Sequence, residues 1–268
     1  MADAQSKRAP RAAAADPSFR DCPSCPLMVP VPTGEFMMGS PEGEPRRNAD
    51  EGPQHRVQIA RPFALSKYEV TFAEWDACVA KGGCAHKPSD EGWGRGRRPV
   101  INVSHADAEQ YVAWLARATG KPYRLATEAE WEYAARGSTA ATAQTPPFAT
   151  GGTIGWKQAN YDANFVYGTG RIGIYRQRTM DVGSLPRNGF GLHDMHGNVW
   201  EWVSDCYKPD YRNAPADGSA VETPGCKLRI LRGGAWNYSP WMLRSAARYA
   251  TPGDVRLNNA GLRVALSL

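Results

Sequence analysis

The stretch that most constrains the interpretation of this chain is Asn188-Gly-Phe-Gly-Leu-His-Asp-Met-His-Gly-Asn-Val-Trp-Glu-Trp202. Its glycines and alternating polar residues are typical of a backbone that wraps closely around a bound group. Hard cations such as calcium take mixed carboxylate and carbonyl oxygens, and Asp194 and Glu201 are the carboxylates available here. The alternative is a glycine-rich turn that leads into a strand with core tryptophans, and the residues alone leave both interpretations open.

The same stretch contains a His-x-x-His pair, His193 and His196. On a helix this spacing would suit zinc, but the surrounding glycines argue against a helix. Transition-metal ligation by this pair is therefore not favoured.

Arginines recur on the C-terminal side of this stretch, in the segments Leu231–Tyr238, Arg244–Arg248 and Asn258–Arg263. They could recognise carboxylates of a ligand, or they could brace a loop-rich core through bidentate pairs with acidic partners such as Glu130 or Glu132. Of these two roles we favour bracing.

A polar and aromatic stretch lies within the same region and comprises Asn237, Tyr238, Ser239 and Trp241. Such residues make adaptable binding surfaces. The whole chain has nine Trp and eleven Tyr against seven Phe, and amphipathic rings in such numbers suit polar-rimmed surfaces and irregular cores. With 27 Gly and 21 Pro among 268 residues, we expect many loops and few long elements.

Three helices are predicted from their caps, all in the first half of the chain. Two of them begin with a capping box, in which a Thr is followed three residues later by a Glu. The predicted capping residues, each with the glycine that ends its helix, are Thr71 with Gly82, Ser104 with Gly120, and Thr127 with Gly137.

Short strands account for the other regular elements that the sequence predicts. Residues 28–40 predict a hairpin or two short strands, and Pro30 and Pro32 would confine the first of these to a sheet edge. Further strands are predicted over residues 55–59, 228–231 and 261–266. Neither half of the chain has a complete set of core-forming elements, so we predict one α+β domain over residues 21–268 after a flexible tail over residues 1–20.

Composition and charge exclude several classes of protein. A chain with 42% hydrophobic and 22% charged residues is neither fibrous nor wholly disordered, and no apolar run is long enough to cross a bilayer. The formal net charge is +5, but four of the cations lie in the N-terminal segment, so nucleic acid is not expected as a partner.

Six cysteines fall into three local pairs. A zinc site would need four converging ligands, and the one Cys-x-x-Cys has no second pair at matching spacing. A thioredoxin-type role is not favoured either, because no strand-to-helix pattern surrounds that motif. Six cysteines permit fifteen connectivities, of which we expect the local one in an exported protein: Cys206–Cys226, Cys78–Cys84 and Cys22–Cys25. No signal sequence is present in this chain, and we expect a periplasmic or secreted location.

Seven segments together resemble the formylglycine-generating enzyme family, also called the sulfatase-modifying-factor domain. They occur in the family's order across residues 26–268, and they are Gly34–Ser40, Tyr68–Thr71, Arg98–Ser104, Arg124–Arg136, Asn188–Trp202, Arg232–Trp236 and Gly261–Arg263. The resemblance implies a C-type-lectin-like α+β fold with unusually little regular secondary structure.

The resemblance also argues against the family's copper chemistry in this chain. Active members oxidise a cysteine of a sulfatase with oxygen and copper(I), which two cysteine thiolates hold. Tyr238 stands at the position of the first of these cysteines, Ala235 replaces the motif serine beside the oxygen pocket, and no cysteine follows Cys226. Copper is therefore not expected, and no catalytic residue is assigned.

Two calcium sites are implied by the same resemblance. The second maps onto Asp194, Gly197, Val199 and Glu201, where Gly197 and Val199 would contribute backbone carbonyls. The first maps onto Asn160 and Tyr161, but its partner loop around Ile174 lacks the expected acidic ligand.

Two functions follow as hypotheses. The first is an exported, calcium-stabilised, lectin-like domain that binds a polypeptide or small molecule without copper chemistry; its predicted ligand-binding residues are Trp200, Trp236, Asn237, Tyr238, Trp241 and Arg248. The second is an oxygen-dependent oxidase that modifies a peptide or a peptide-derived metabolite, because some members of the family act in siderophore maturation without the copper cysteines.

Overall fold

The structure is a computed structural model that describes residues 17–138 and 145–268. Three α-helices lie where the caps predicted them, α1 (Phe72–Ala80), α2 (His105–Thr119) and α3 (Glu128–Arg136). Each begins with a capping box, and in each the side chain of the predicted cap, Thr71, Ser104 or Thr127, accepts a hydrogen bond from the third helical N–H. None of the helices in the described ranges has the length and apolar character needed to cross a membrane.

One four-stranded antiparallel sheet joins the two ends of the domain. Its strand order is β1 (Met28–Val31), β4 (Phe63–Ser66), β10 (Val264–Ser267) and β5 (Tyr123–Leu125). Pro30 lies in an edge strand, as predicted, because its missing N–H would leave a gap inside a sheet.

The other strands form a two-stranded and a four-stranded sheet. The first pairs β2 (Gly34–Met38) with β3 (His55–Ile59), so residues 28–40 form two strands in different sheets and not a hairpin. The second has the order β8 (Arg248–Pro252), β7 (Leu228–Arg232), β6 (Trp200–Cys206) and β9 (Ala260–Leu262), with β6 and β9 parallel. Two short 3-10 helices, η1 (Ala49–Glu51) and η2 (Pro240–Leu243), complete the regular elements of the described ranges.

The strand predicted over residues 261–266 is divided in the structure. It forms β9 in one sheet and β10 in another, and Arg263 lies between them. The break turns the Arg263 side chain into the interior, where it is about 1% exposed.

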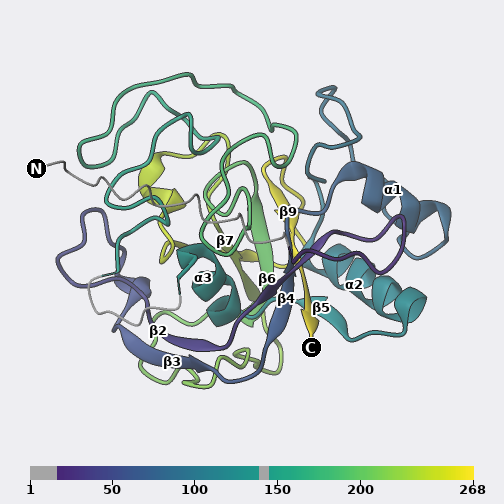
Figure 1. Cartoon of the computed structure of the whole chain (residues 1–268), viewed down its shortest axis with the longest axis horizontal. Coiled ribbons are helices and arrows are strands. Elements are labelled where there is room, and N and C mark those ends of the chain that lie inside the picture. The colour runs from purple at the N-terminus through teal and green to yellow at the C-terminus, as the bar shows by residue number, and fades with distance from the viewer. Residues whose placement is uncertain (1–16, 139–144) are drawn as a thin grey trace, which may run out of the picture.

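Long loops cover much of the molecule (Figure 1). Between α3 and β6 the described residues contain no helix or strand, as the glycine and proline content predicted. In Figure 1 these teal and green loops lie on the side away from α1 and α2. Four of the nine tryptophans, Trp75, Trp131, Trp200 and Trp202, are fully buried in the core.

The predicted division into a tail over residues 1–20 and a domain over residues 21–268 stays a prediction. Residues 1–16 of that tail lie outside the described residues, and Phe19 exchanges two backbone hydrogen bonds with Met28. All three predicted disulfides, Cys22–Cys25, Cys78–Cys84 and Cys206–Cys226, are confirmed.

Candidate functional site

A cluster of buried and partly buried charged residues includes two members of the stretch that runs from Asn188 to Trp202, Asp194 and Glu201. Arg263 donates to both carboxylate oxygens of Glu201, with 2.9 Å between Nη2 and Oε1. The Trp131 indole donates to the same carboxylate at 2.6 Å, and the Asp194 carboxylate accepts from the Gly183 N–H at 2.7 Å. Sequence reasoning missed Glu69, whose Oε1 accepts from Asn198 and whose buried Oε2 has no partner among the described residues.

The electrostatics of this cluster favour a positive charge. Burial raises the pKa of Asp194 to about 6, and it raises the pKa of Glu69 well above its usual range. Neighbouring carboxylates add to both shifts, because three acidic side chains face the single guanidinium of Arg263. Protonation of a carboxyl group or binding of a divalent cation would relieve the repulsion among these side chains.

Asn160 and Gly197, one residue from each of the two predicted calcium sites, lie in contact. Asn160 pairs with Gly197 in a parallel bridge, and the Asn160 side chain donates to Asn198 Oδ1 at 3.1 Å. Gly197 has φ of +93°, and a Cβ there would lie 2.4 Å from the Asn160 carbonyl oxygen, so only glycine fits. Tyr161 and Val199 are fully buried.

Side chains alone do not complete a metal site here. Within residues 17–138 and 145–268, no three His, Cys, Asp or Glu side chains are placed to hold a metal together. In the second site that the resemblance implies, backbone carbonyls of Gly197 and Val199 would join the two carboxylates, and this part of the prediction remains untested. Ile174, in the predicted partner loop of the first site, is 55% exposed.

The two histidines of the His-x-x-His pair have separate roles. His196 is buried, with Nδ1 2.8 Å from the Leu243 carbonyl oxygen, and its Nε2 accepts from the Ala149 N–H. His193 Nδ1 lies 2.7 Å from the carbonyl oxygen of Leu185. Both rings therefore hold loops in place.

We use the name aromatic face for the surface formed by four residues: Trp236, Asn237, Tyr238 and Trp241. Trp236 is 9% exposed and the other three are partly exposed. Several rings pack around the face. Trp93 and Tyr175 contact Trp236, Trp200 and Tyr249 contact Tyr238, and Phe165 contacts Trp241, with ring centroids 5.2–6.4 Å apart.

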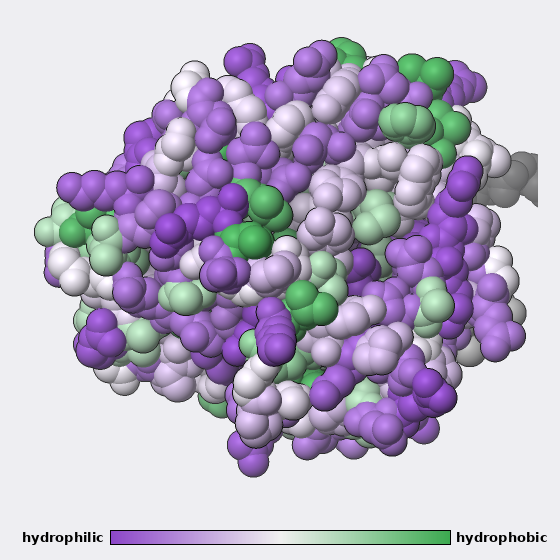
Figure 2. Space-filling view, turned by 180° about the vertical axis from the view of Figure 1, so that it is seen from behind, coloured by the Kyte–Doolittle hydropathy of each residue, from purple (hydrophilic) through white to green (hydrophobic). Residues whose placement is uncertain are grey.

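Exposed hydrophobic side chains adjoin the aromatic face, and sequence reasoning missed them. Of the six large hydrophobic residues that are exposed among those described, four lie in one loop: Phe165, Val166, Ile172 and Ile174. The side of the molecule drawn in Figure 2 is mostly hydrophilic, with hydrophobic residues in small separate groups. The available signal was a segment with apolar residues but no strand or helix period.

Two predicted ligand-binding residues lie in the interior. Trp200 is fully buried and stacks on Tyr249, and Arg248 is 4% exposed and paired with Glu128 at 2.7 Å. Arg248 lines a hollow of about 560 Å³ that lies between the start of α3 and residues 205–221, and not the aromatic face. The buried polar groups there satisfy one another, since Glu128 accepts from Arg248 and Tyr211.

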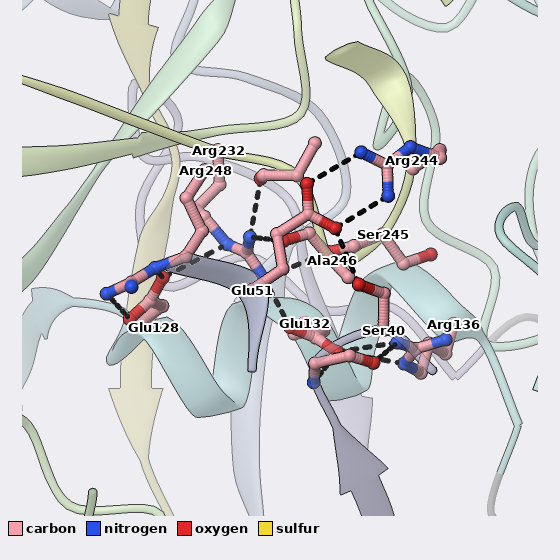
Figure 3. A network of polar contacts seen from close by, with 12 residues as sticks. Ser40, Glu51, Glu128, Glu132, Arg136, Arg232, Arg244, Ser245, Ala246 and Arg248 are labelled. Carbon is pink, nitrogen blue, oxygen red and sulfur yellow. Dashed lines mark hydrogen bonds and ion pairs between the residues drawn. The ribbon is translucent and has the colours of Figure 1, made fainter. Parts of the chain in front are cut away.

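The recurring arginines brace the fold, as predicted (Figure 3). Arg232 and Arg136 both pair with Glu132, the predicted partner, and Arg244 pairs with Glu51 at 2.6 Å. The other predicted partner, Glu130, pairs with Arg124. In Figure 3 the pairs of Glu132 and of Glu51 belong to one buried network, whose side chains come from strands, loops and helix α3.

A family model described as the sulfatase-modifying factor enzyme 1-like domain matches residues 13–268. The chain belongs to this family. Within the sulfatase-modifying-factor family, it is 32% identical to the formylglycine-generating enzyme of Streptomyces coelicolor, over 95% of this chain and 94% of that protein. It is 27% identical to the inactive C-alpha-formylglycine-generating enzyme 2 of Mus musculus, over 90% of this chain and 86% of that protein.

A solved relative in this family supports the fold assignment. The structure of PvdO from Pseudomonas aeruginosa is 39% identical, covers 96% of this chain and 100% of that chain, and superposes with a TM-score of 0.80. The predicted formylglycine-generating-enzyme-type α+β fold is thereby confirmed.

Proposed function

We propose that this member of the sulfatase-modifying-factor family is a calcium-stabilised domain that binds a polypeptide or a small molecule at the aromatic face. One observation carries the proposal. The partly exposed Asn237, Tyr238 and Trp241 adjoin the loop that holds four of the six exposed large hydrophobic residues in the described ranges. Contiguous apolar surface with a polar component is typical of interaction sites.

Calcium is proposed at Asp194, Gly197, Val199 and Glu201. Carboxylate and carbonyl oxygens are the ligands that calcium takes, and three buried or partly buried acidic side chains, Glu69, Asp194 and Glu201, lie around one guanidinium here. Arg263 and Trp131 already donate four hydrogen bonds to the Glu201 carboxylate, so a bound ion would share Glu201 with these donors. When bound, the ion would fix the loop whose Asn198 carbonyl accepts a hydrogen bond from the Trp236 N–H of the aromatic face. Asn160 and Tyr161 are proposed to contribute to a first calcium site.

Copper-dependent oxidation is not part of the proposed function. All six cysteines form disulfides, so none offers the thiolate that copper(I) prefers. Tyr238 stands where the family would place the first copper cysteine, and its ring packs against Trp200. The three disulfides favour an oxidising compartment, and we propose the periplasm or the exterior.

A screen of a short-peptide library against immobilised protein tests the binding role. We expect Trp241→Ala and Phe165→Ala to lose the peptides that the wild type retains. Leu228→Ala is the matched control, because Leu228 is also an exposed hydrophobic residue but is not part of the loop with Phe165. Peptides retained equally by all variants would contradict the proposed site.

The second candidate function is oxygen-dependent oxidation of a peptide or a peptide-derived metabolite. It is favoured by membership in a family whose relatives include formylglycine-generating enzymes. Metal analysis of protein purified without chelator separates the two candidates. Stoichiometric calcium alone supports the binding domain, whereas redox-active copper or iron with substrate-dependent oxygen consumption supports the oxidase.

A further inference from the structure

Three arginines line a shallow hollow of about 440 Å³ together with Thr179 and Asp181. They are Arg98, Arg176 and Arg178, and among the residues that the structure describes none of them forms an ion pair with a carboxylate. This distinguishes them from the arginines of the buried network, each of which is paired. The hollow therefore carries a net positive charge, since Asp181 is its one acidic lining residue.

Hydrogen bonds to uncharged groups hold the guanidinium groups of Arg98 and Arg176 in place, and no described carboxylate neutralises them. Arg98 donates to the carbonyl and the hydroxyl of Thr179, and Arg176 Nη2 donates to the Trp156 carbonyl at 2.9 Å. The Nη1 of Arg176 is buried and has no partner in the described ranges. Burial also lowers the pKa of Arg176, which reflects a charged group that lacks a compensating anion.

The hollow and the aromatic face are built by the same loops. One loop supplies Trp93 to the Trp236 ring and Arg98 to the hollow. A second supplies Tyr175 to the Trp236 ring and Arg176 to the hollow, and the Cα atoms of consecutive residues are only about 3.8 Å apart. The hollow and the aromatic face therefore share two loops, and Tyr175 and Arg176 place them one residue apart in the second loop.

We infer that the ligand of the aromatic face is an acidic peptide, whose carboxylates bind Arg98, Arg176 and Arg178 while a hydrophobic side chain packs on Trp236 and its neighbours. This inference rests on the proposed function. Guanidinium groups match carboxylates in planar, bidentate pairs. The aliphatic Ile172 and Ile174 beside the face suit peptide side chains better than stacked bases, which favours a peptide over a single-stranded nucleic acid.

Two peptides test the inference: acetyl-Glu-Leu-Trp-Glu-amide and its neutral counterpart acetyl-Gln-Leu-Trp-Gln-amide, titrated calorimetrically. We expect the wild type to bind the acidic peptide about tenfold more tightly at low ionic strength, a preference that added salt reduces. Arg178→Gln should remove most of this preference. Its side chain makes no hydrogen bond or ion pair within the described ranges, so the fold should tolerate the change.

Arg117→Gln is the matched control, because Arg117 is exposed on α2 and does not line the hollow; it should keep the preference. Trp241→Ala should weaken both peptides alike, which tests the aromatic face separately. Equal binding of the two peptides by the wild type would overturn the inference and leave the proposed function standing. No binding of either peptide, or tighter binding of a single-stranded oligonucleotide than of the acidic peptide, would also overturn it.

Discussion

Arg263 and Glu201 form a fully buried ion pair, with 2.9 Å between Nη2 and Oε1 and both side chains about 1% exposed. The pair connects the break between β9 and β10 to the central strand β6. Arg263 also donates to the carbonyls of Ser66 and His193, so one side chain joins both four-stranded sheets to the loop that carries Asp194.

Removal of this guanidinium should be strongly destabilising. Arg263→Met leaves Glu201 buried without its partner, which costs about 3–5 kcal/mol. Arg256→Met is the control, because Arg256 pairs with Asp107 at the surface with 47% of its side chain exposed, and such pairs contribute about 0–1 kcal/mol. Urea unfolding measures both, and equal losses would contradict the role assigned to the buried pair.

Calcium removal tests the proposed metal site. We expect chelator to lower the melting temperature of the wild type, and Glu201→Ala to lower it and abolish this calcium dependence. Glu132→Ala breaks another buried ion pair, with Arg232, and should lower the melting temperature while keeping the response to calcium. A wild-type melt that is identical with and without chelator would refute the site.

Acidification should destabilise the fold through His196. Burial lowers the pKa of His196 to about 4, from an unfolded value near 6.5, because the charged ring is disfavoured away from water and the Arg136 guanidinium repels it. Between about pH 4 and pH 6.5, His196 therefore binds a proton in the unfolded chain but not in the folded chain. Stability is therefore lost as the pH falls from about 6.5 to about 4, by up to about 1.4 kcal/mol per unit. Unfolding of His196→Gln across this range should show a flatter profile, and an unchanged slope would exclude His196 as the cause.

The disulfides should be complete in the native protein. A thiol assay of unreduced protein should detect no free cysteine, since all six are paired. Replacing Cys206 and Cys226 with Ala should cost about 3 kcal/mol, against about 2 kcal/mol for Cys22 and Cys25, because the first pair closes the longer loop. Titration of Cys206 and Cys226 as thiols would contradict both the pairing and the proposed export.

The sequence predicted the elements whose causes are local. Thr71, Ser104 and Thr127 cap helices through contacts three residues away, and the cysteine pairs lie within 20 residues of each other. Contacts between residues far apart in the sequence leave no local pattern from which they could be predicted. Arg244 binds Glu51 across 193 residues, and no local pattern selects that carboxylate over the others.

In the candidate site, too, only part of the arrangement could be predicted from the sequence. The motif arginines were expected to brace the core, but Trp200 and Arg248 were expected near a ligand and lie in the interior. Their burial depends on β6 and β8 joining one sheet, which alternation within short segments does not reveal. The arginine hollow arises because loops around residues 98 and 178, far apart in sequence, meet beside the aromatic face.

The position of β10 between β4 and β5 has a consequence for biosynthesis. A ribosome must have made residues 264–267 before the sheet that contains β1 can receive its inner strand. Strand β4 therefore lacks its neighbour β10 during most of the synthesis of residues 1–268. Contacts between residues so far apart in the sequence also form slowly. If the chain is exported as proposed, this late closure would keep β4 and β5 without their shared neighbour, and the chain open to translocation, until β10 has been made.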